Sequence, residues 1–226
     1  MTPVIELDQV SKIYQMDEVK VQALNKVDLK IKEKEFVAIM GPSGCGKSTL
    51  LQMIGCLDRP TSGKILLDGA DTSKLNETQL ARVRGKKIGF VFQYFNLYPT
   101  LTAQANVELP MMIVEEEKQF RQKRAMELLK IVGLAERASH LPSQLSGGER
   151  QRIAIARALA NEPSFILADE PTGNLDSKSG TEIMKILVKL NDEGKTIVVV
   201  THDMTIASHS KHIIQMKDGK IIDGKK

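Results

Sequence analysis

The residues best suited to chemistry lie in one stretch, Gly41-Pro42-Ser43-Gly44-Cys45-Gly46-Lys47-Ser48-Thr49. Its spacing fits G-x-x-x-x-G-K-[S/T], a loop in which backbone N–H groups converge on phosphate oxygens. We expect Lys47 to reach the β- and γ-phosphates of a nucleoside triphosphate, and the Ser48 hydroxyl to ligate Mg²⁺. The glycines matter because a Cβ there would obstruct the turn or the ligand. The alternative is a glycine-rich turn that contains a lysine by chance.

Acidic, imidazole and amide side chains follow three other apolar runs. Asp169 and Glu170 come directly after the run 165–168, and the carboxyl end of a parallel strand is a typical place for a Mg²⁺-binding Asp. We expect Asp169 to hold the ion through water, and Glu170 to take a proton from the water that attacks the γ-phosphate. His202 is predicted to contact the γ-phosphate, and Gln93 could touch both Mg²⁺ and the attacking water. Taken alone, each residue also fits an ordinary solvated strand end.

A second glycine-rich turn, Leu145-Ser146-Gly147-Gly148-Glu149-Arg150-Gln151, opens a predicted helix. A helix N-terminus attracts anions, so this turn is a second anion site by the same physics. One phosphate loop already wraps one triphosphate, so the second site needs a different nucleotide. A twofold dimer satisfies both, with Ser146 and its helix capping the nucleotide that the partner chain holds. An ordinary capped helix start is the alternative.

The surrounding sequence predicts an α/β fold that positions these residues. The loop lies between an apolar run, 36–40, and a helix, and the runs 165–168 and 196–200 are typical of buried parallel strands. Apolar residues at helical spacing between 183 and 190 predict a crossover helix between the last two strands. Alternating apolar residues predict antiparallel strands near 5–7 and 27–31. Further strands are predicted at 64–68, at 88–92 and on either side of the turn Asp218-Gly219.

The middle of the chain is predicted to be mostly helical. Residues 116–132 carry an apolar face at i, i+3, i+4 and i+7, and residues 150–160 predict another helix. The segment 96–110 predicts a loop and a short helix that stops at Pro110. We therefore expect a single domain with two parts: a core with an antiparallel β subdomain (1–95 and 160–226) and an inserted helical subdomain (96–159).

Composition excludes several classes of protein. The 226 residues include 32 basic and 28 acidic ones, and a net charge of +4 spread along the chain does not indicate nucleic-acid binding. The start of the sequence lacks the pattern of a signal peptide, and no apolar run approaches the ~18 residues of a membrane span. We expect any membrane spans to belong to another chain.

The chain resembles the ATPase subunit of an ATP-binding-cassette (ABC) transporter over essentially its full length. The matching motifs are Walker A (GPSGCGKST), the Q-loop glutamine Gln93, the signature LSGGE, Walker B (ILADE), the D-loop Gly173-Asn174-Leu175-Asp176 and the switch histidine His202. The resemblance implies a P-loop NTPase core, ATP and Mg²⁺ as ligands, and an ATP-dependent homodimer. It further implies that Tyr14 stacks on adenine, that Asp176 lies at the dimer seam, and that residues after Gln93 meet a membrane permease subunit.

The sequence departs from the family pattern at one position of the signature. Glu149 stands where glutamine is common, and a carboxylate accepts but does not donate hydrogen bonds. We expect a modest change in affinity for the partner's nucleotide. Stretches near 54–58 and 90–97 resemble the macrolide-exporter and lipoprotein-releasing group.

The leading hypothesis is therefore an ATP hydrolase at the cytoplasmic side of the cell membrane that powers a transporter or mechanotransmission complex. The alternatives are a soluble ABC-type ATPase acting on ribosomes or nucleic acid, and a regulatory module without turnover. Intact Lys47, Asp169, Glu170 and His202 argue against the last.

Overall fold

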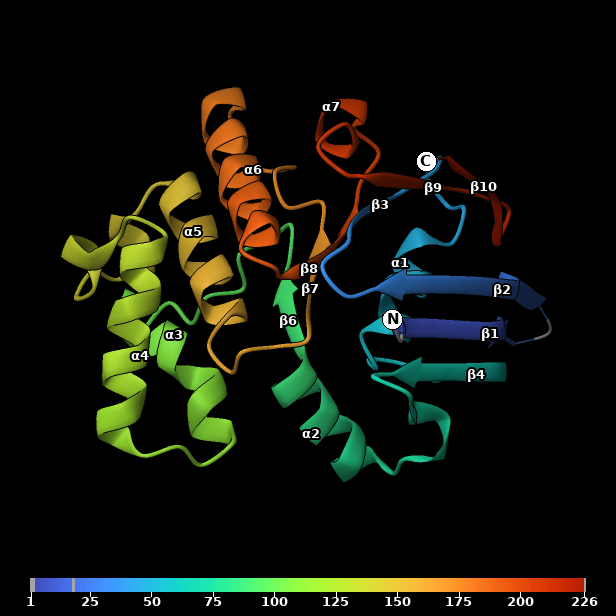
Figure 1. Cartoon of the computed structure of the whole chain (residues 1–226), viewed down its shortest axis with the longest axis horizontal. Helices are drawn as coiled ribbons and strands as arrows, with labels where there is room; N and C mark the ends of the chain where they lie inside the picture. Colours follow the sequence, from blue (N-terminus) through green and yellow to red (C-terminus); the bar gives the residue numbers. More distant parts are fainter. Residues whose placement is uncertain (1–2, 18, 226) are drawn as a thin grey trace.

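The computed structural model describes residues 3–17 and 19–225, and a six-stranded sheet runs through its centre (Figure 1). The strand order is β10-β9-β3-β8-β7-β6, with antiparallel pairing only between β10 and β9 in this sheet as described. Its strands are β3 (Phe36–Met40), β6 (Ile88–Val91), β7 (Phe165–Asp169), β8 (Thr196–Val200), β9 (His212–Lys217) and β10 (Lys220–Lys225). The mostly parallel sheet expected from the continuous apolar runs is confirmed.

An antiparallel sheet packs beside the central one, at the right of Figure 1. Its order is β2-β1-β4-β5, and its strands are β1 (Pro3–Met16), β2 (Val19–Lys32), β4 (Ser62–Leu67) and β5 (Ala70–Asp71). In β2, the buried residues Val27, Leu29 and Ile31 alternate with exposed ones. This period of two lets one face of the strand join the core, as the sequence predicted.

Both faces of the central sheet are buried, each in a different core. Leu167 and Val198 pack with the antiparallel sheet and with α1 (Lys47–Ile54). Their chain neighbours Ile166 and Val199 point the other way, into a core formed with the helices after β6. Successive side chains of a strand alternate between faces, so a strand covered on both sides must be apolar throughout.

The helices after β6 gather at the end of the molecule opposite the antiparallel sheet (Figure 1). They are α3 (Ala103–Ile113), α4 (Lys118–Ile131), α5 (Gly147–Ala158) and, after β7, α6 (Ser177–Asp192). The predicted stop at Pro110 is wrong, because α3 continues through it to Ile113. Burial of Asn106 and Met111 holds the helix, and Asn161 Nδ2 donates to the Pro110 carbonyl at 3.0 Å. This packing compensates for the free-energy cost of the backbone hydrogen bond that proline cannot donate.

Helices α2 (Glu77–Lys87) and α7 (Met204–Ala207) were not predicted, and the predicted strand at 88–92 was too long. Helix α2 buries only Leu80, so it shows no apolar periodicity, although Asn76 and Gln79 form a capping box at its start. Strand β6 ends at Val91, one residue earlier than predicted, so Gln93 lies in the loop beyond it. The short helix α7 completes the elements that concern the site.

Candidate functional site

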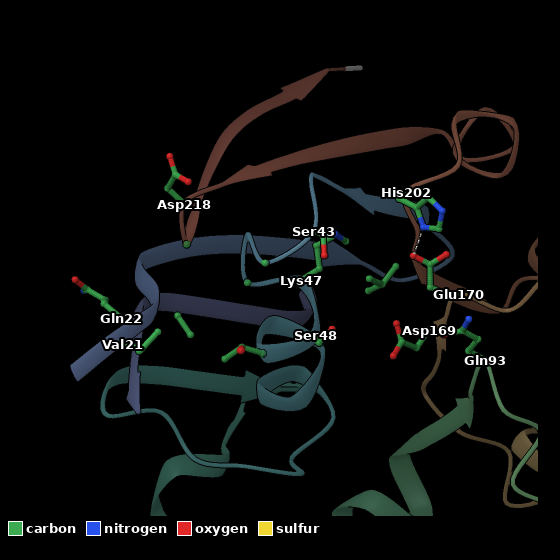
Figure 2. A pocket seen from close by; sticks show the side chains of 16 residues that line it. Val21, Gln22, Ser43, Lys47, Ser48, Gln93, Asp169, Glu170, His202 and Asp218 are labelled. Carbon is green, nitrogen blue, oxygen red and sulfur yellow. Dashed lines mark hydrogen bonds and ion pairs between the residues drawn. The ribbon is translucent and has the colours of Figure 1, made fainter. Parts of the chain in front are cut away.

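The phosphate loop runs between β3 and the start of α1. Gly46 has a φ of 102°, and a Cβ there would lie 2.4 Å from the carbonyl oxygen of Ala23. Only glycine fits that close approach to β2. The Lys47 ammonium donates to the carbonyl oxygens of Gly41 at 2.7 Å and Pro42 at 2.9 Å. These bonds hold the lysine side chain back over the loop, as Figure 2 shows.

The other predicted catalytic side chains converge on this loop from the carboxyl ends of neighbouring strands. Glu170 follows β7, His202 follows β8 by two residues, and Gln93 follows β6 by two. Because β8 lies next to β3 in the sheet, and β7 next to β8, these ends share one edge with the loop. A cavity of about 640 Å³ opens there (Figure 2), lined among others by Ser43, Gly44, Gly46, Lys47, Ser48, Thr49, Gln93, Asp169, Glu170 and His202.

Glu170 is held by two neighbours from the end of β8. His202 Nδ1 lies 2.6 Å from Glu170 Oε1, the contact dashed in Figure 2, and the Thr201 hydroxyl donates to Glu170 Oε2 at 3.3 Å. The backbone of Glu170 has a φ of 44°, in the left-handed region that a side chain disfavours. Backbone strain of this kind gathers at functional sites. The carboxylate is thus aimed at the cavity by contacts on both oxygens.

Asp169 carries a carboxylate that is partly withdrawn from water. Burial raises its pKa above the ordinary value, the neighbouring Glu170 carboxylate adds to this, and Lys47 opposes both. A cation in the cavity would favour the ionised form. The Ser48 hydroxyl and the Gln93 amide line the same cavity, so oxygen donors of the kind that Mg²⁺ binds surround one space. The residues present therefore fit this ion.

Tyr14 lines a second hollow that continues from the first. This hollow of about 640 Å³ is also lined by Gln52 and Asp58, and it shares Val21, Ser48 and Thr49 with the phosphate cavity. The Tyr14 hydroxyl contacts Asp58 Oδ2 at 3.1 Å and Gln52 Oε1 at 3.2 Å. Tyr14 and the phosphate loop therefore line two adjoining hollows.

The second glycine-rich turn forms a capping box but does not line the phosphate cavity. Ser146 caps α5, since its hydroxyl accepts from the Glu149 N–H at 3.2 Å, while Glu149 Oε2 accepts from the Ser146 N–H at 2.8 Å. A Cβ on Gly148 would lie 2.9 Å from the Ser179 hydroxyl of α6, and one on Gly147 would approach Leu175 at 3.2 Å. The turn thus packs on the D-loop and α6, whose N-cap is Asp176.

Some residues of the site were missed by sequence reasoning. Asp218 and Gly219 were read only as a hairpin turn, yet they line the phosphate cavity, and the Gly219 N–H donates to the Cys45 carbonyl at 3.0 Å. Lys12 also escaped notice; its ammonium lies 4.9 Å from the Tyr14 ring and pairs with Asp58 at 2.7 Å. Alternating apolar residues predict the strands that carry Lys12 and the turn Asp218-Gly219. They do not show that these residues lie beside Tyr14 and the phosphate loop.

Comparison with known proteins identifies the family. The profile described as ABC transporter matches residues 24–173. The chain belongs to the ABC transporter family. An uncharacterized ABC transporter ATP-binding protein of Thermotoga maritima is 55% identical over 98% of this chain and 94% of its own. The macrolide export ATP-binding/permease protein MacB 2 of Aeromonas hydrophila is 51% identical over 97% of this chain, which spans only 34% of that protein.

Solved structures agree with this assignment. The ATP-binding cassette MJ0796, in a dimeric post-hydrolysis state bound to ADP and Pi, superposes with a TM-score of 0.90 and 52% identity, over 98% of each chain. This ABC protein is thus an ATP-binding, ATP-hydrolysing transporter subunit, and the ribosome or nucleic-acid alternative is not supported. Within the described part of the chain, the helices are all too short or too polar to cross a bilayer.

Proposed function

We propose that two copies of this chain close around two molecules of ATP, each held by the phosphate loop of one copy and the Ser146 turn of the other. The supporting observation is the position of that turn. It is a helix N-terminus, where the positive end of the helix dipole attracts anions, yet among the described residues it does not line the chain's own phosphate cavity. A second chain supplies what each cavity lacks.

The residues divide the work as follows. Lys47, with the Ser43–Thr49 part of its loop, binds the phosphates, and Tyr14 stacks on the adenine. Glu170 takes a proton from the attacking water, held by His202, which also meets the γ-phosphate. Gln93 orients that water. Mg²⁺, held by Ser48, Asp169 and Gln93, would neutralise charge on the phosphates. Asp176, the N-cap of α6, lies at the seam between the two chains, and its neighbours Leu175 and Ser179 contact the Ser146 turn.

We also propose that the moving parts are the two subdomains expected from the sequence. Residues 96–159 form the helical part that carries the signature turn, and 1–95 with 160–226 form the core. Closure of the dimer would move a membrane permease, to which the residues after Gln93 attach at the cytoplasmic side of the membrane. Tyr94 and Tyr98 are exposed, so their side chains are accessible to such a partner. The likeness to MacB favours an export-type complex.

Mixing two inactive variants tests the shared site. Lys47→Ala removes the phosphate-binding cation, and Ser146→Arg blocks the signature turn, so each variant alone forms two defective sites. In a mixed dimer, the intact loop of one chain meets the intact turn of the other. We therefore expect the mixture to retain ATP, at about one molecule per two chains, when neither variant does so alone.

The control is the double variant Lys47→Ala/Ser146→Arg mixed with Lys47→Ala, which offers no intact loop. Retention of ATP is measured by filter binding of labelled nucleotide with Mg²⁺ at 4 °C. Equal retention by the two mixtures, or full ATP binding and turnover by Ser146→Arg alone, would show that each site is complete within one chain. Mixed dimers are counted by a tag on one variant.

A further inference from the structure

A single buried amide joins α5 to the loops that carry Glu170 and Gln93. The Gln151 side chain is fully buried, and its Nε2 donates to the carbonyl oxygen of Pro171 at 2.6 Å and to that of Phe92 at 3.1 Å. Both neighbours accept hydrogen bonds, so the amide nitrogen must be the atom that faces them. Pro171 directly follows Glu170, and Phe92 directly precedes Gln93.

The backbone around Glu170 needs such support. Its φ of 44° is left-handed, and the next residue is proline, which further restricts the conformation of the residue before it. Two backbone bonds hold the residue itself: the Glu170 N–H donates to Val200 O at 2.9 Å, and the Glu170 carbonyl accepts from Gly173 N–H at 3.0 Å. The bond from Gln151 fixes the next peptide unit, so it completes the set that holds the strained turn in place.

We infer that Gln151 is a positioning residue, which fixes the Glu170 backbone so that its carboxylate lies where the attacking water is deprotonated. The inference rests on the proposed role of Glu170 as the base. Gln151 lies on the helix that begins with the Ser146 turn, five residues further along the chain.

A comparable amide elsewhere in the chain serves as a matched control. Asn191, at the end of α6, is nearly buried, and its Nδ2 donates to the carbonyl oxygens of Lys34 at 3.0 Å and Lys195 at 2.8 Å. These residues lie at the edge of the sheet opposite the phosphate cavity, before β3 and β8. Removing either amide leaves two carbonyls without their donor, so both changes weaken packing, but only one touches the base.

The test compares Gln151→Met with Asn191→Leu by steady-state ATP hydrolysis. A misplaced catalytic group costs about 10²-fold in rate, so Gln151→Met should lower kcat by about ten- to a hundredfold and leave KM for ATP within about twofold. Asn191→Leu should lower the melting temperature by about as much as Gln151→Met does, but it should leave kcat within about twofold of the wild-type value. Equal kcat in the two variants, at matched melting temperatures, would overturn the inference.

A double-variant cycle separates positioning from general damage. In a Glu170→Gln background the positioned group is already gone, so Gln151→Met should change the residual rate by less than about twofold and leave ATP-dependent dimerisation intact. A full additional loss of rate, or loss of the dimer, would assign Gln151 to the fold or to the Ser146 turn instead. If Glu170→Gln itself hydrolyses ATP normally, the proposed base is wrong, which is a different result.

A second variant covers the case in which Gln151→Met does not fold. Gln151→Asn keeps the amide but is one methylene shorter, so it cannot reach both carbonyl oxygens. It should lower kcat by several-fold with KM retained, and an unchanged kcat in this variant would also overturn the inference.

Discussion

Replacing Glu149 with alanine should destabilise α5, and replacing it with glutamine should do so less. Glu149 Oε2 accepts from the Ser146 N–H at 2.8 Å, and Oε1 lies 3.4 Å from Arg137 Nε. The hydrogen bond to the Ser146 backbone is the largest cause of the lowered pKa of Glu149; partial burial opposes it, and Arg137 adds to it. Glutamine keeps the hydrogen bond and loses only the charge, so the family's usual residue can replace glutamate here.

The size of the effect follows from these contacts. Loss of a capping bond, of an acidic group near a helix N-terminus and of one half-exposed ion pair amounts to about 1–2 kcal/mol for Glu149→Ala. In a chain of this length each kcal/mol lowers the melting temperature by about 2–4 °C, so we expect a fall of about 2–8 °C. Glu149→Gln should lose about 0.3–1 kcal/mol.

Thermal melts by circular dichroism at pH 7.5 and in steps to below about pH 3 test this reasoning, because the folded pKa lies below the ordinary value. A lowered pKa in the folded state means that the ionised group stabilises the protein above its ordinary value of 4.5, and that this is lost as the pH falls through the folded value. Wild type and Glu149→Gln should therefore converge at low pH. Gln79→Ala, in the uncharged capping box of α2, is the control and should show no such pH dependence. Equal losses for Glu149→Gln and Glu149→Ala at pH 7.5 would refute the capping argument.

Three further substitutions probe the nucleotide site. Glu170→Gln should slow ATP hydrolysis by about 10²–10⁴-fold and accumulate as an ATP-bound dimer in gel filtration; an unchanged rate removes it from the role of base. Tyr14→Ala should weaken ATP and GTP binding alike, by about 1–3 kcal/mol in titration calorimetry, because stacking tolerates any base; unchanged affinities would contradict stacking. Asp169→Asn should raise the melting temperature of the nucleotide-free protein at pH 8 and weaken Mg²⁺-dependent ATP binding. A raised pKa means that ionised Asp169 costs stability, so the gain in melting temperature should shrink as the pH falls through the folded value.

Much of this fold was predictable because the decisive signals are local in sequence. Residues 165–168 of β7 and 197–200 of β8 are all apolar, since both faces of the sheet are covered, and the phosphate loop is marked by glycines at fixed spacing. Helix α2 gave no such signal, because it lies on the surface and buries one side chain. Pro110 wrongly indicated the end of a helix, because α3 is stabilised by packing against residues distant in sequence.

The site was predictable by residue type but not by contact. Spacing and strand ends indicated Asp169, Glu170 and His202, yet nothing in the sequence shows that Gln151 reaches across to Pro171, twenty residues further on. Nor does it show that Lys12 pairs with Asp58 beneath Tyr14. Such contacts depend on how the loops lie after the sheet has formed.

The left-handed backbone at Glu170 has a practical consequence for engineering. A side chain in that conformation before proline stores about 1–3 kcal/mol of strain, which glycine would release. Directed evolution that selects only for thermal stability or expression should therefore enrich Glu170→Gly. This variant is more stable but lacks the proposed catalytic carboxylate. Libraries of this protein need a screen for turnover at every round, because abundance and activity will diverge at this residue.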